Sequence, residues 1–337
     1  MAGAFEEAVA AHRAGDFETA ERGYRAFAHH PVALHNLAVL YNAAGRFAEA
    51  EAAFRKVLKA KPDFAASEHS LAMLWLGAGR YAQGWPAYEG PPAVPGAYLP
   101  PAPDLPEWRG EDLRGKRLRV YGEQGFGDQI QLSRLFPALT QLGAEVSFVC
   151  SPILETLFAP LGITVVGGRE GVALPEADCW TLIGSLPWRL DLREATIPPP
   201  TDLRVPLGAG GGTGVVVRGR PTHANDANRS LNAEDAARLL ALGRDLSPEA
   251  TGAMDFLETA RIVAGLDRVI SVDTAIAHLA ATLGKPTWIL LPARGVDWRW
   301  GRQGEGSVWY PTVRLFRQPA HGDWSAVLGE IEARAAD

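Results

Sequence analysis

Residues 271–286 read SVDTAIAHLAATLGKP and combine the end of a strand, a tight turn and a helix. The apolar stretch 267–273 ends in Asp273, Thr274 opens the helix, and His278 lies one turn further on. A strand that runs through a short polar turn into a helix is the repeating unit of a parallel α/β sheet. The free backbone N–H groups at such a helix start suit a diphosphate, whereas a single helical histidine is also a common core residue. The predicted phosphate-binding residues of this stretch are Asp273, Thr274, Ala275 and His278.

The same alternation extends over residues 213–337, which we predict to be one small Rossmann-like domain. Its strands are expected at 213–217, 267–273, 286–292 and 313–317, and its helices at 232–243, 259–266, 275–284 and 323–336. The loop HANDANRS, residues 223–230, follows the first of these strands. Arginine and asparagine donors in and before this loop favour an anion site, and a solvated polar loop is the alternative. The predicted donor-binding residues are Arg218, Asn225, Asn228 and Arg229, with Arg220 nearby.

Residues 117–207 show the same pattern and predict a first Rossmann-like domain. Strands are expected at 118–122, 144–150, 163–168 and 177–184, and helices at 129–143 and 151–162. The turn GEQGFGD, residues 122–128, joins the first strand to its helix, and Gly125 and Gly127 allow a ligand to approach the backbone closely. Asp128 is then either a functional carboxylate or simply the helix N-cap. A hinge rich in proline and glycine separates the two domains, so a ligand is expected in the cleft between them.

The first ninety residues repeat a helix-pair pattern. Gly15, Gly45 and Gly79 are each followed by an aromatic residue two positions on, a small residue five positions on and an aromatic residue nine positions on. The first interval is 30 residues and the second is 34, so one helical turn is expected to be missing between the first two units. A generic helical bundle is the alternative. Residues 91–116 are rich in proline and are predicted to be an extended linker.

Composition and charge exclude some classes of function, namely those of nucleic-acid-binding and membrane-spanning proteins. With 33 basic and 39 acidic side chains the net charge is −6, which argues against a nucleic-acid partner. No apolar stretch reaches the length of a membrane span, and the N-terminal residues lack a secretory pattern, so a cytoplasmic location is expected. Cys150 and Cys179 are expected to be free thiols in buried strands.

The helix pairs resemble tetratricopeptide repeats, and the later motifs resemble glycosyltransferase family 9, the heptosyltransferase-like group. The resemblance to the transferases rests on the Gly-Asp pair ending at Asp128, the DTAIAHLAATLGKP stretch, ANDANRS and the aromatic string over 297–324. It is closest to bacterial proteins that join such repeats to such a transferase domain. Some relatives of that kind glycosylate proteins, flagellin among them.

The resemblance implies a GT-B fold, meaning two Rossmann-like domains with a cleft, placed after the helical repeats. It implies an inverting transfer that needs no metal and no cofactor, with a nucleotide-activated sugar as the donor substrate. In the family pattern the Gly-Asp aspartate is the general base, and it falls on Asp128. The Asp-Thr-Ala turn, with His278 close by, would hold the donor diphosphate. A protein or peptide acceptor would bind the repeats, which are also a candidate surface for homo-oligomers or a mere structural cap.

Three positions depart from the pattern of these relatives. Residues 88–91 read YEGP where Tyr-Glu-x-Arg is usual, and the stretch VVVRGRP has arginine where tryptophan is expected. Residues 243–256 are shorter than a full strand-loop-helix unit, which predicts a trimmed nucleobase pocket. Two alternatives therefore remain: a catalytically silent scaffold, or a heptosyltransferase-like enzyme acting on a glycolipid. The late tryptophans, either walls of the sugar cleft or core residues, are Trp298, Trp300 and Trp309.

Overall fold

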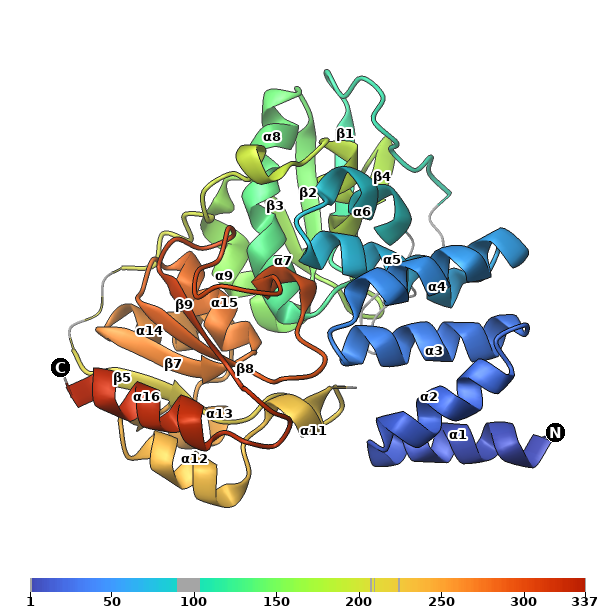
Figure 1. Ribbon diagram of the computed structural model, residues 1–337. Coiled ribbons are helices and arrows are strands. Elements are labelled where there is room, and N and C mark those ends of the chain that lie inside the picture. The colour runs from blue at the N-terminus through green and yellow to red at the C-terminus, as the bar shows by residue number, and fades with distance from the viewer. Residues whose placement is uncertain (1, 90–103, 207, 209, 224, 337) are drawn as a thin grey trace. The chain divides into compact units, whose positions relative to one another are not determined.

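The computed structural model describes residues 2–89, 104–206, 208, 210–223 and 225–336 of the 337-residue chain. They form a helical unit, made of the described residues up to 89 plus Asp297–Arg302, and an α/β unit made of the rest (Figure 1). The predicted order, helices first and a parallel α/β part second, is confirmed. The first half of the predicted linker 91–116, residues 91–103, lies outside the described residues. Its described end runs extended beside Trp180, with Trp108 buried.

Helices joined in pairs by tight turns make up the helical unit. The turn glycines have left-handed backbones, with φ of 81° at Gly15, 73° at Gly45 and 72° at Gly79, where a side chain would be strained. Small residues let the paired helices approach: a Cβ at Gly84 would lie 2.5 Å from Leu76 Cδ2. The helices are α1 (Ala2–Ala14), α2 (Phe17–Ala26), α3 (Pro31–Ala43), α4 (Phe47–Ala60), α5 (Ala65–Gly77) and α6 (Tyr81–Tyr88).

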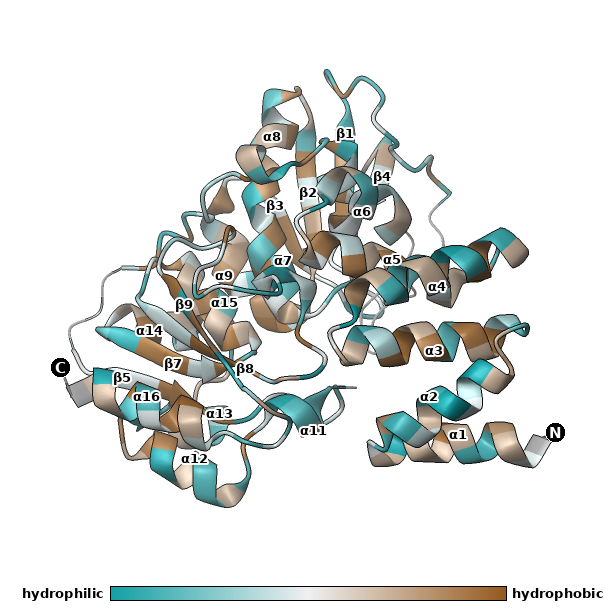
Figure 2. Ribbon diagram, viewed as in Figure 1, coloured by the Kyte–Doolittle hydropathy of each residue, from teal (hydrophilic) through white to brown (hydrophobic). Residues whose placement is uncertain are grey.

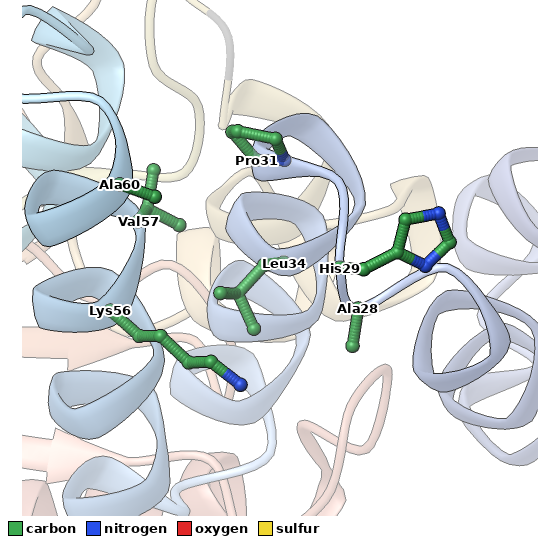
Figure 3. Close-up of a pocket in the computed structure, with 7 residues that line it drawn as sticks. All are labelled: Ala28, His29, Pro31, Leu34, Lys56, Val57 and Ala60. Carbon is green, nitrogen blue, oxygen red and sulfur yellow. The ribbon is translucent and has the colours of Figure 1, made fainter.

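The shorter first interval of the repeat comes from α2. This helix has 10 residues, whereas its counterpart α4 has 14. Because the connections after both helices are equally long, the missing turn lies in α2 itself. A cavity of about 430 Å³ lies between the α2–α3 turn and the last turns of α4 (Figure 3). Lys56 extends from α4 toward Ala28 there, and the ring of His29 points away from Leu34. The cavity is lined by Ala28, His29, Pro31, Leu34, Lys56, Val57 and Ala60.

A segment from late in the chain completes the helical unit. The short helix η6 (Trp298–Trp300) places the Trp298 ring 5.2 Å from that of Trp85 and 6.1 Å from that of Tyr88. Arg302 lies 3.7 Å over the ring of Phe47 and donates a hydrogen bond to the carbonyl of Leu74. Trp298 is therefore a packing residue of the helical unit, as the core alternative had it.

The first sheet of the α/β unit is parallel and has the order β3-β2-β1-β4. Cys150 is buried at the end of β2, while Cys179 is half-buried at the start of β4, so the expectation of two buried thiols holds only for Cys150. Both thiols are free, as predicted. The strands are β1 (Arg117–Tyr121), β2 (Glu145–Cys150), β3 (Thr164–Gly167) and β4 (Cys179–Leu182).

The second sheet is also parallel, with the order β6-β5-β7-β8-β9. Val215 and Ile270 face the core beneath α12 (Ala233–Leu240) and α16 (Ser325–Ala336). Val216 and Val269 face the opposite core, beneath α14 (Phe256–Ala264) and α15 (Ala275–Thr282). Figure 2 shows β7 mostly brown, as expected for a strand covered on both faces. The strands are β5 (Thr213–Val216), β6 (Arg244–Asp245), β7 (Arg268–Val272), β8 (Thr287–Leu291) and β9 (Val313–Arg317).

Two predicted helices of the first half are interrupted. The segment expected at 129–143 is α7 (Phe126–Leu132), a 3-10 turn and then α8 (Phe136–Gln141). The segment expected at 151–162 keeps one α-helical turn, α9 (Glu155–Phe158), between two 3-10 turns. Pro137 stands in the first turn of α8. Proline lacks an N–H and its ring obstructs the preceding turn, which explains a break at that point.

The short segment 243–256 contains the two-residue strand β6 and a four-residue helix, α13 (Pro248–Thr251). Ser247 caps this helix, and Gly252 ends it with φ of +71°. The segment is thus a reduced strand-turn-helix unit at the edge of the second sheet.

Candidate active site

The crevice of the first sheet lies between β1 and β4. The chain proceeds from β1 to β2 and β3 on one side and then returns to place β4 on the other side. Loops at such a reversal separate and leave room for a ligand at the carboxyl ends of the strands. Here they are the loop after β1, which leads into α7, and the 3-10 turn Ile183–Ser185 after β4.

Asp128 lies in the first turn of α7 and is not its N-cap. The cap position belongs to Gly125, so the N-cap reading of Asp128 is wrong. A Cβ at Gly125 would lie 3.0 Å from Asp128 Oδ2, so the carboxylate folds back over this glycine. The side chain is half-buried. A carboxylate in the first turn interacts favourably with the positive end of the helix dipole.

Gln129 holds the loop before α7 in shape. Its Nε2 donates to the carbonyls of Gly122 and Gln124, at 3.1 and 2.8 Å. Its Oε1 accepts from the backbone N–H of Ser151 at 3.0 Å. This buried amide therefore ties the loop after β1 to the loop after β2 and limits the motion of Asp128 next to it.

Glu123 is a second carboxyl in this loop, and the sequence analysis missed it. The residue is only 2 % exposed. Its Oε1 accepts hydrogen bonds from the backbone N–H of Gly184 at 3.1 Å and from Gln124 Nε2 at 3.0 Å. Burial raises the pKa of Glu123 to about 7. The sequence shows two acids, separated by four residues, in a glycine-rich loop, and this pattern could have indicated a carboxyl pair. The sequence does not show that one of them is buried.

The crevice of the second sheet lies between β5 and β7, where the strand order reverses in the same way. Asp273 follows β7 directly, and Thr274 is the N-cap of α15, accepting from the N–H of Ala277 at 3.4 Å. Thr274 Oγ1 also lies 3.0 Å from Ser271 Oγ. The turn Asp273–Thr274–Ala275 thus stands where the sequence predicted, at the start of a helix of eight residues.

The HANDANRS loop meets this turn through Arg229. The guanidinium donates from Nη1 to the carbonyl of Asp273 at 2.9 Å and lies 3.4 Å from Asp226 Oδ1. Arg229 is 9 % exposed and holds the two loops together. Arg218, by contrast, is exposed and makes no hydrogen bond or ion pair with the residues that the structure describes.

The predicted asparagines form a short chain of hydrogen bonds. Asn225 is the N-cap of α11 (Asp226–Arg229) and donates to the carbonyl of Gly295 at 2.7 Å. Asn228 Nδ2 donates to Asn225 Oδ1 at 2.6 Å. Both amides are half-buried, so they order the loop whether or not they also contact a ligand.

Helices α7 and α15 pack against each other and bring the two predicted motifs together. A Cβ at Gly127 would lie 2.6 Å from His278 Cδ2 and 3.4 Å from Ala275 Cα. Real Cβ atoms do not approach so closely, so this contact requires glycine. Asp128 is therefore adjacent to the residue that touches the DTAIAH helix.

His278 is buried at this contact. Its Nδ1 lies 3.0 Å from the hydroxyl of Tyr310, and the two rings meet edge to face at 5.7 Å. Arg134 is a further residue that the sequence analysis missed: it is buried and lies 4.9 Å from the Tyr310 ring centre. It also donates to the carbonyl of Trp309 at 2.8 Å. Trp309 and Tyr310 are buried, as core residues would be.

Comparison with known proteins finds a family model that matches part of the chain. Residues 220–290 match the model of glycosyltransferase family 9 (heptosyltransferase). This stretch contains the HANDANRS loop, β7 and α15. The resemblance seen in the motifs is confirmed for this stretch, which is similar to glycosyltransferase family 9.

A curated relative extends the likeness beyond the residues that the family model matches. Protein FlbA of Caulobacter vibrioides is 26 % identical over 321 residues, an alignment that covers 76 % of this chain and 52 % of FlbA. The chain thus spans about half the length of that relative. A mutant of the Thermobaculum terrenum O-GlcNAc transferase aligns with 88 % of this chain and 82 % of its own, at 15 % identity and a TM-score of 0.25. That score is too low to support an argument from shared fold.

None of the helices in the described residues is long and apolar enough to cross a membrane. The longest of them, α4, has 14 residues.

Proposed function

We propose that the chain is an inverting glycosyltransferase with the GT-B arrangement, which moves a sugar from a nucleotide-activated donor to a hydroxyl of a protein acceptor. The observation that carries the proposal is the contact of Gly127 with His278 and Ala275. It packs the residue directly before Asp128 against the helix whose N-terminus suits a diphosphate.

The proposed step is a single displacement. The acceptor oxygen attacks the anomeric carbon while Asp128 takes the proton of the acceptor hydroxyl. The bond between the anomeric carbon and the diphosphate oxygen breaks, and its electron pair leaves with the nucleoside diphosphate. The configuration at the anomeric carbon inverts because the new bond forms opposite the bond that breaks.

The departing diphosphate carries the charge that this step develops. The free N–H groups at the start of α15, together with Thr274, are aimed at such an anion. Arg218 is an exposed cation two residues after the end of β5, at the carboxyl edge of the same sheet. We propose that these groups balance the charge without a divalent metal, and that neither a metal nor a cofactor is required.

The helix pairs support the protein-acceptor part of the proposal. Repeats of paired helices expose an extended surface of the kind that binds peptides. We therefore infer that they are tetratricopeptide repeats, and that they present the acceptor. Flagellin is one acceptor of this type, and oligomers through the repeats are the other use of that surface.

The reduced segment at β6 and α13 favours a second candidate, a scaffold that binds without transferring. It lies at the edge of the sheet that would bind the nucleotide, so its reduction bears on the nucleobase pocket first. An enzyme and a scaffold differ in the effect of replacing Asp128, since only catalysis depends on its basicity.

The test compares the wild type, Asp128→Asn and, as a matched control, Glu145→Gln, an exposed carboxyl at the opposite end of the first sheet. Thermal shifts with ADP, UDP, GDP, CMP and dTDP measure nucleotide binding. Transfer of labelled sugar from the corresponding nucleotide sugars to extract proteins, with and without EDTA, measures activity.

We expect one nucleotide to stabilise all three proteins. The transfer rate should fall by about 10²–10⁴-fold in Asp128→Asn alone, which is the usual contribution of a general base. EDTA should leave the rate unchanged. Stabilisation by no nucleotide would contradict the transferase proposal, and binding without transfer in the wild type would favour the scaffold.

A further inference from the structure

The early end of α2 leaves open a space that the corresponding helix of the next repeat fills. The glycine spacing aligns Ala26, the last residue of α2, with Lys56 of α4, but α4 continues for one more turn to Ala60. That turn contains Val57, which is fully buried, and Leu58, which packs against the core of the helical unit. In the first repeat the chain leaves the helix after Ala26, and the cavity of about 430 Å³ lies beside that point (Figure 3).

The floor of this cavity is apolar. Leu34 and Val57 line it, and both belong to the hydrophobic cluster that holds the helix pairs together. Pro31, at the start of α3, and the half-buried Ala28 add further apolar surface. A volume of about 430 Å³ falls within the range of ligand pockets. The floor can therefore take up apolar side chains of a partner.

The rim of the cavity carries positive charge with no carboxylate to balance it. Lys56 extends from α4 toward Ala28, and Lys59 follows three positions later on the same helix (Figure 3). Both lysines are exposed, and neither makes a hydrogen bond or ion pair with the residues that the structure describes. The stretches 26–46 and 52–62 contain every lining residue, and neither stretch has an aspartate or a glutamate.

The lysines at the rim differ in this respect from the arginines of the same helix pairs. Arg25 of α2 pairs with Glu21 at 2.7 Å, and Arg55 of α4 pairs with Glu51 at 2.9 Å. The charges of these guanidinium groups are compensated within the helical unit, whereas the charge at the rim is left for a partner. A partner with negative charge is therefore attracted, and a partner with positive charge is disfavoured.

We propose that this cavity is a docking site for a partner protein, and that its occupant is one turn of an acidic amphipathic helix. Apolar side chains of that turn contact Leu34 and Val57, and an Asp or Glu one turn away along the helix meets Lys56. The turn takes the place that α2 leaves open beside α4. The inference goes beyond the proposed transfer and does not depend on it, because the helical unit alone provides every lining residue.

Fluorescence anisotropy with three labelled peptides tests the site on the full chain. The first peptide is a helix of about sixteen residues with leucines at helical spacing and glutamates on the flanking positions. The second has alanine in place of each leucine, and the third has lysine in place of each glutamate. We expect the second peptide to bind at least about tenfold more weakly than the first, because burial of the leucines supplies most of the affinity. The third peptide should bind more weakly than the first, and less so at high salt.

Reversal of the charge at the rim gives a sharper test. Lys56→Glu should weaken binding of the glutamate peptide by about tenfold and strengthen binding of the lysine peptide, because an attraction is replaced by a repulsion and the reverse. Arg13→Glu is the matched control. Arg13 is an exposed cation in the last turn of α1, at the opposite end of the first helix pair from the cavity. This control should leave both affinities unchanged.

Filling the cavity tests the site independently of charge. Insertion of a copy of residues 57–60 after Ala26 extends α2 by the missing turn. We expect this variant to lose binding of the glutamate peptide while its Tm does not fall. If the insertion variant does not fold, Ala60→Leu narrows the same cavity from an exposed position and should weaken binding.

Three outcomes would overturn the inference. The first is that the peptide with leucine and glutamate does not bind. The second is that the alanine peptide binds equally well, since the rim then attracts any polyanion, a nucleic acid included. The third is a dimer in sedimentation velocity that the insertion abolishes, since the occupant is then a second copy of the chain. Peptide binding that is lost on filling the cavity supports the inference, whether or not the chain transfers sugar.

Discussion

The two parallel sheets of the α/β unit carry loops of opposite character at equivalent topological positions. At the first reversal, between β1 and β4, the loops meet through a carboxyl: Glu123 accepts from the backbone of Gly184. At the second, between β5 and β7, they meet through a cation: Arg229 donates to the carbonyl of Asp273. One crevice therefore offers acids, and the other offers N–H donors and positive charge.

This difference suits the two crevices to different tasks, proton transfer at the first and anion binding at the second. Carboxyl groups whose charge depends on their surroundings can accept or hold a proton. A helix start with free N–H groups and a nearby guanidinium attracts phosphate. Because α7 packs on α15 through Gly127, the two kinds of site adjoin, and variants can test each of them separately.

Gly127→Ala should have the largest effect of the variants that test this comparison. Its Cβ would lie 2.6 Å from His278 Cδ2, so α7 and α15 would have to move apart. Overpacking of this kind costs about 1–3 kcal/mol of stability, and transfer should be lost with it. Thermal unfolding and the transfer assay measure the two effects.

Gly329→Ala is the matched control, since its Cβ would meet nothing within 4 Å on the exposed face of α16. It should stabilise the protein by about 0.5–1 kcal/mol. If both variants behave alike, the two crevices do not depend on the Gly127 contact.

Arg229→Gln and Arg218→Gln should separate a structural from a ligand-binding arginine. Arg229 is buried and bonded to Asp273, so its loss should lower stability by about 1.5–3 kcal/mol. Arg218 is exposed, so its loss should leave the Tm unchanged but weaken nucleotide binding, more so at low salt. Urea unfolding and nucleotide titrations at two salt concentrations measure both. Equal nucleotide affinity in Arg218→Gln and the wild type would remove Arg218 from the donor site.

Glu51→Gln should have the smallest effect, because Glu51 lies outside the two crevices that are compared. Hydrogen bonding by Arg80, with help from Trp75 and Arg55, lowers the pKa of Glu51 to about 2. Because the folded pKa lies below the ordinary 4.5, the stabilisation is present above pH 4.5 and is lost as the pH falls toward 2. We expect a loss of about 1 kcal/mol at pH 7, as for a partly exposed network, shrinking between pH 5 and 3.

Thermal unfolding over that pH range checks the result for Glu51, with the exposed Glu68→Gln as the control. Glu51 belongs to the helical unit, so the transfer rate at pH 7 should not change. A change in that rate would show that a carboxyl outside the two crevices contributes to transfer.

Much of this arrangement was predictable because it follows local periodicity. Strand-turn-helix patterning located β1, β5 and β7 together with the turns that follow them, and Thr274 capped its helix as expected. The glycine spacing located the helix pairs, and the four missing residues were traced to α2. Each of these features depends on residues close together in the sequence.

The remainder depended on tertiary contacts that no local pattern encodes. In the sequence Glu123 is one polar residue of a loop. In the structure it accepts a hydrogen bond from the N–H of Gly184, 61 positions later. Arg134 lies in a segment predicted only as helix, and its burial against Trp309 and Tyr310 was not predicted. The sequence pattern predicted one long helix through Pro137, whereas in the structure this proline interrupts the helix. Burial of a charge and the partner of a loop are both decided by distant parts of the chain.

The aromatic site around Trp85 and Tyr88 can be completed only some time after these two residues are synthesised. Its third ring, Trp298, is contributed by a residue 210 positions after Tyr88. A ribosome adds about 5–20 residues per second, so roughly 10–40 s separate the two events. During that interval the helices have left the ribosome with this apolar site uncovered. The helical unit is therefore completed only after synthesis has passed Trp298.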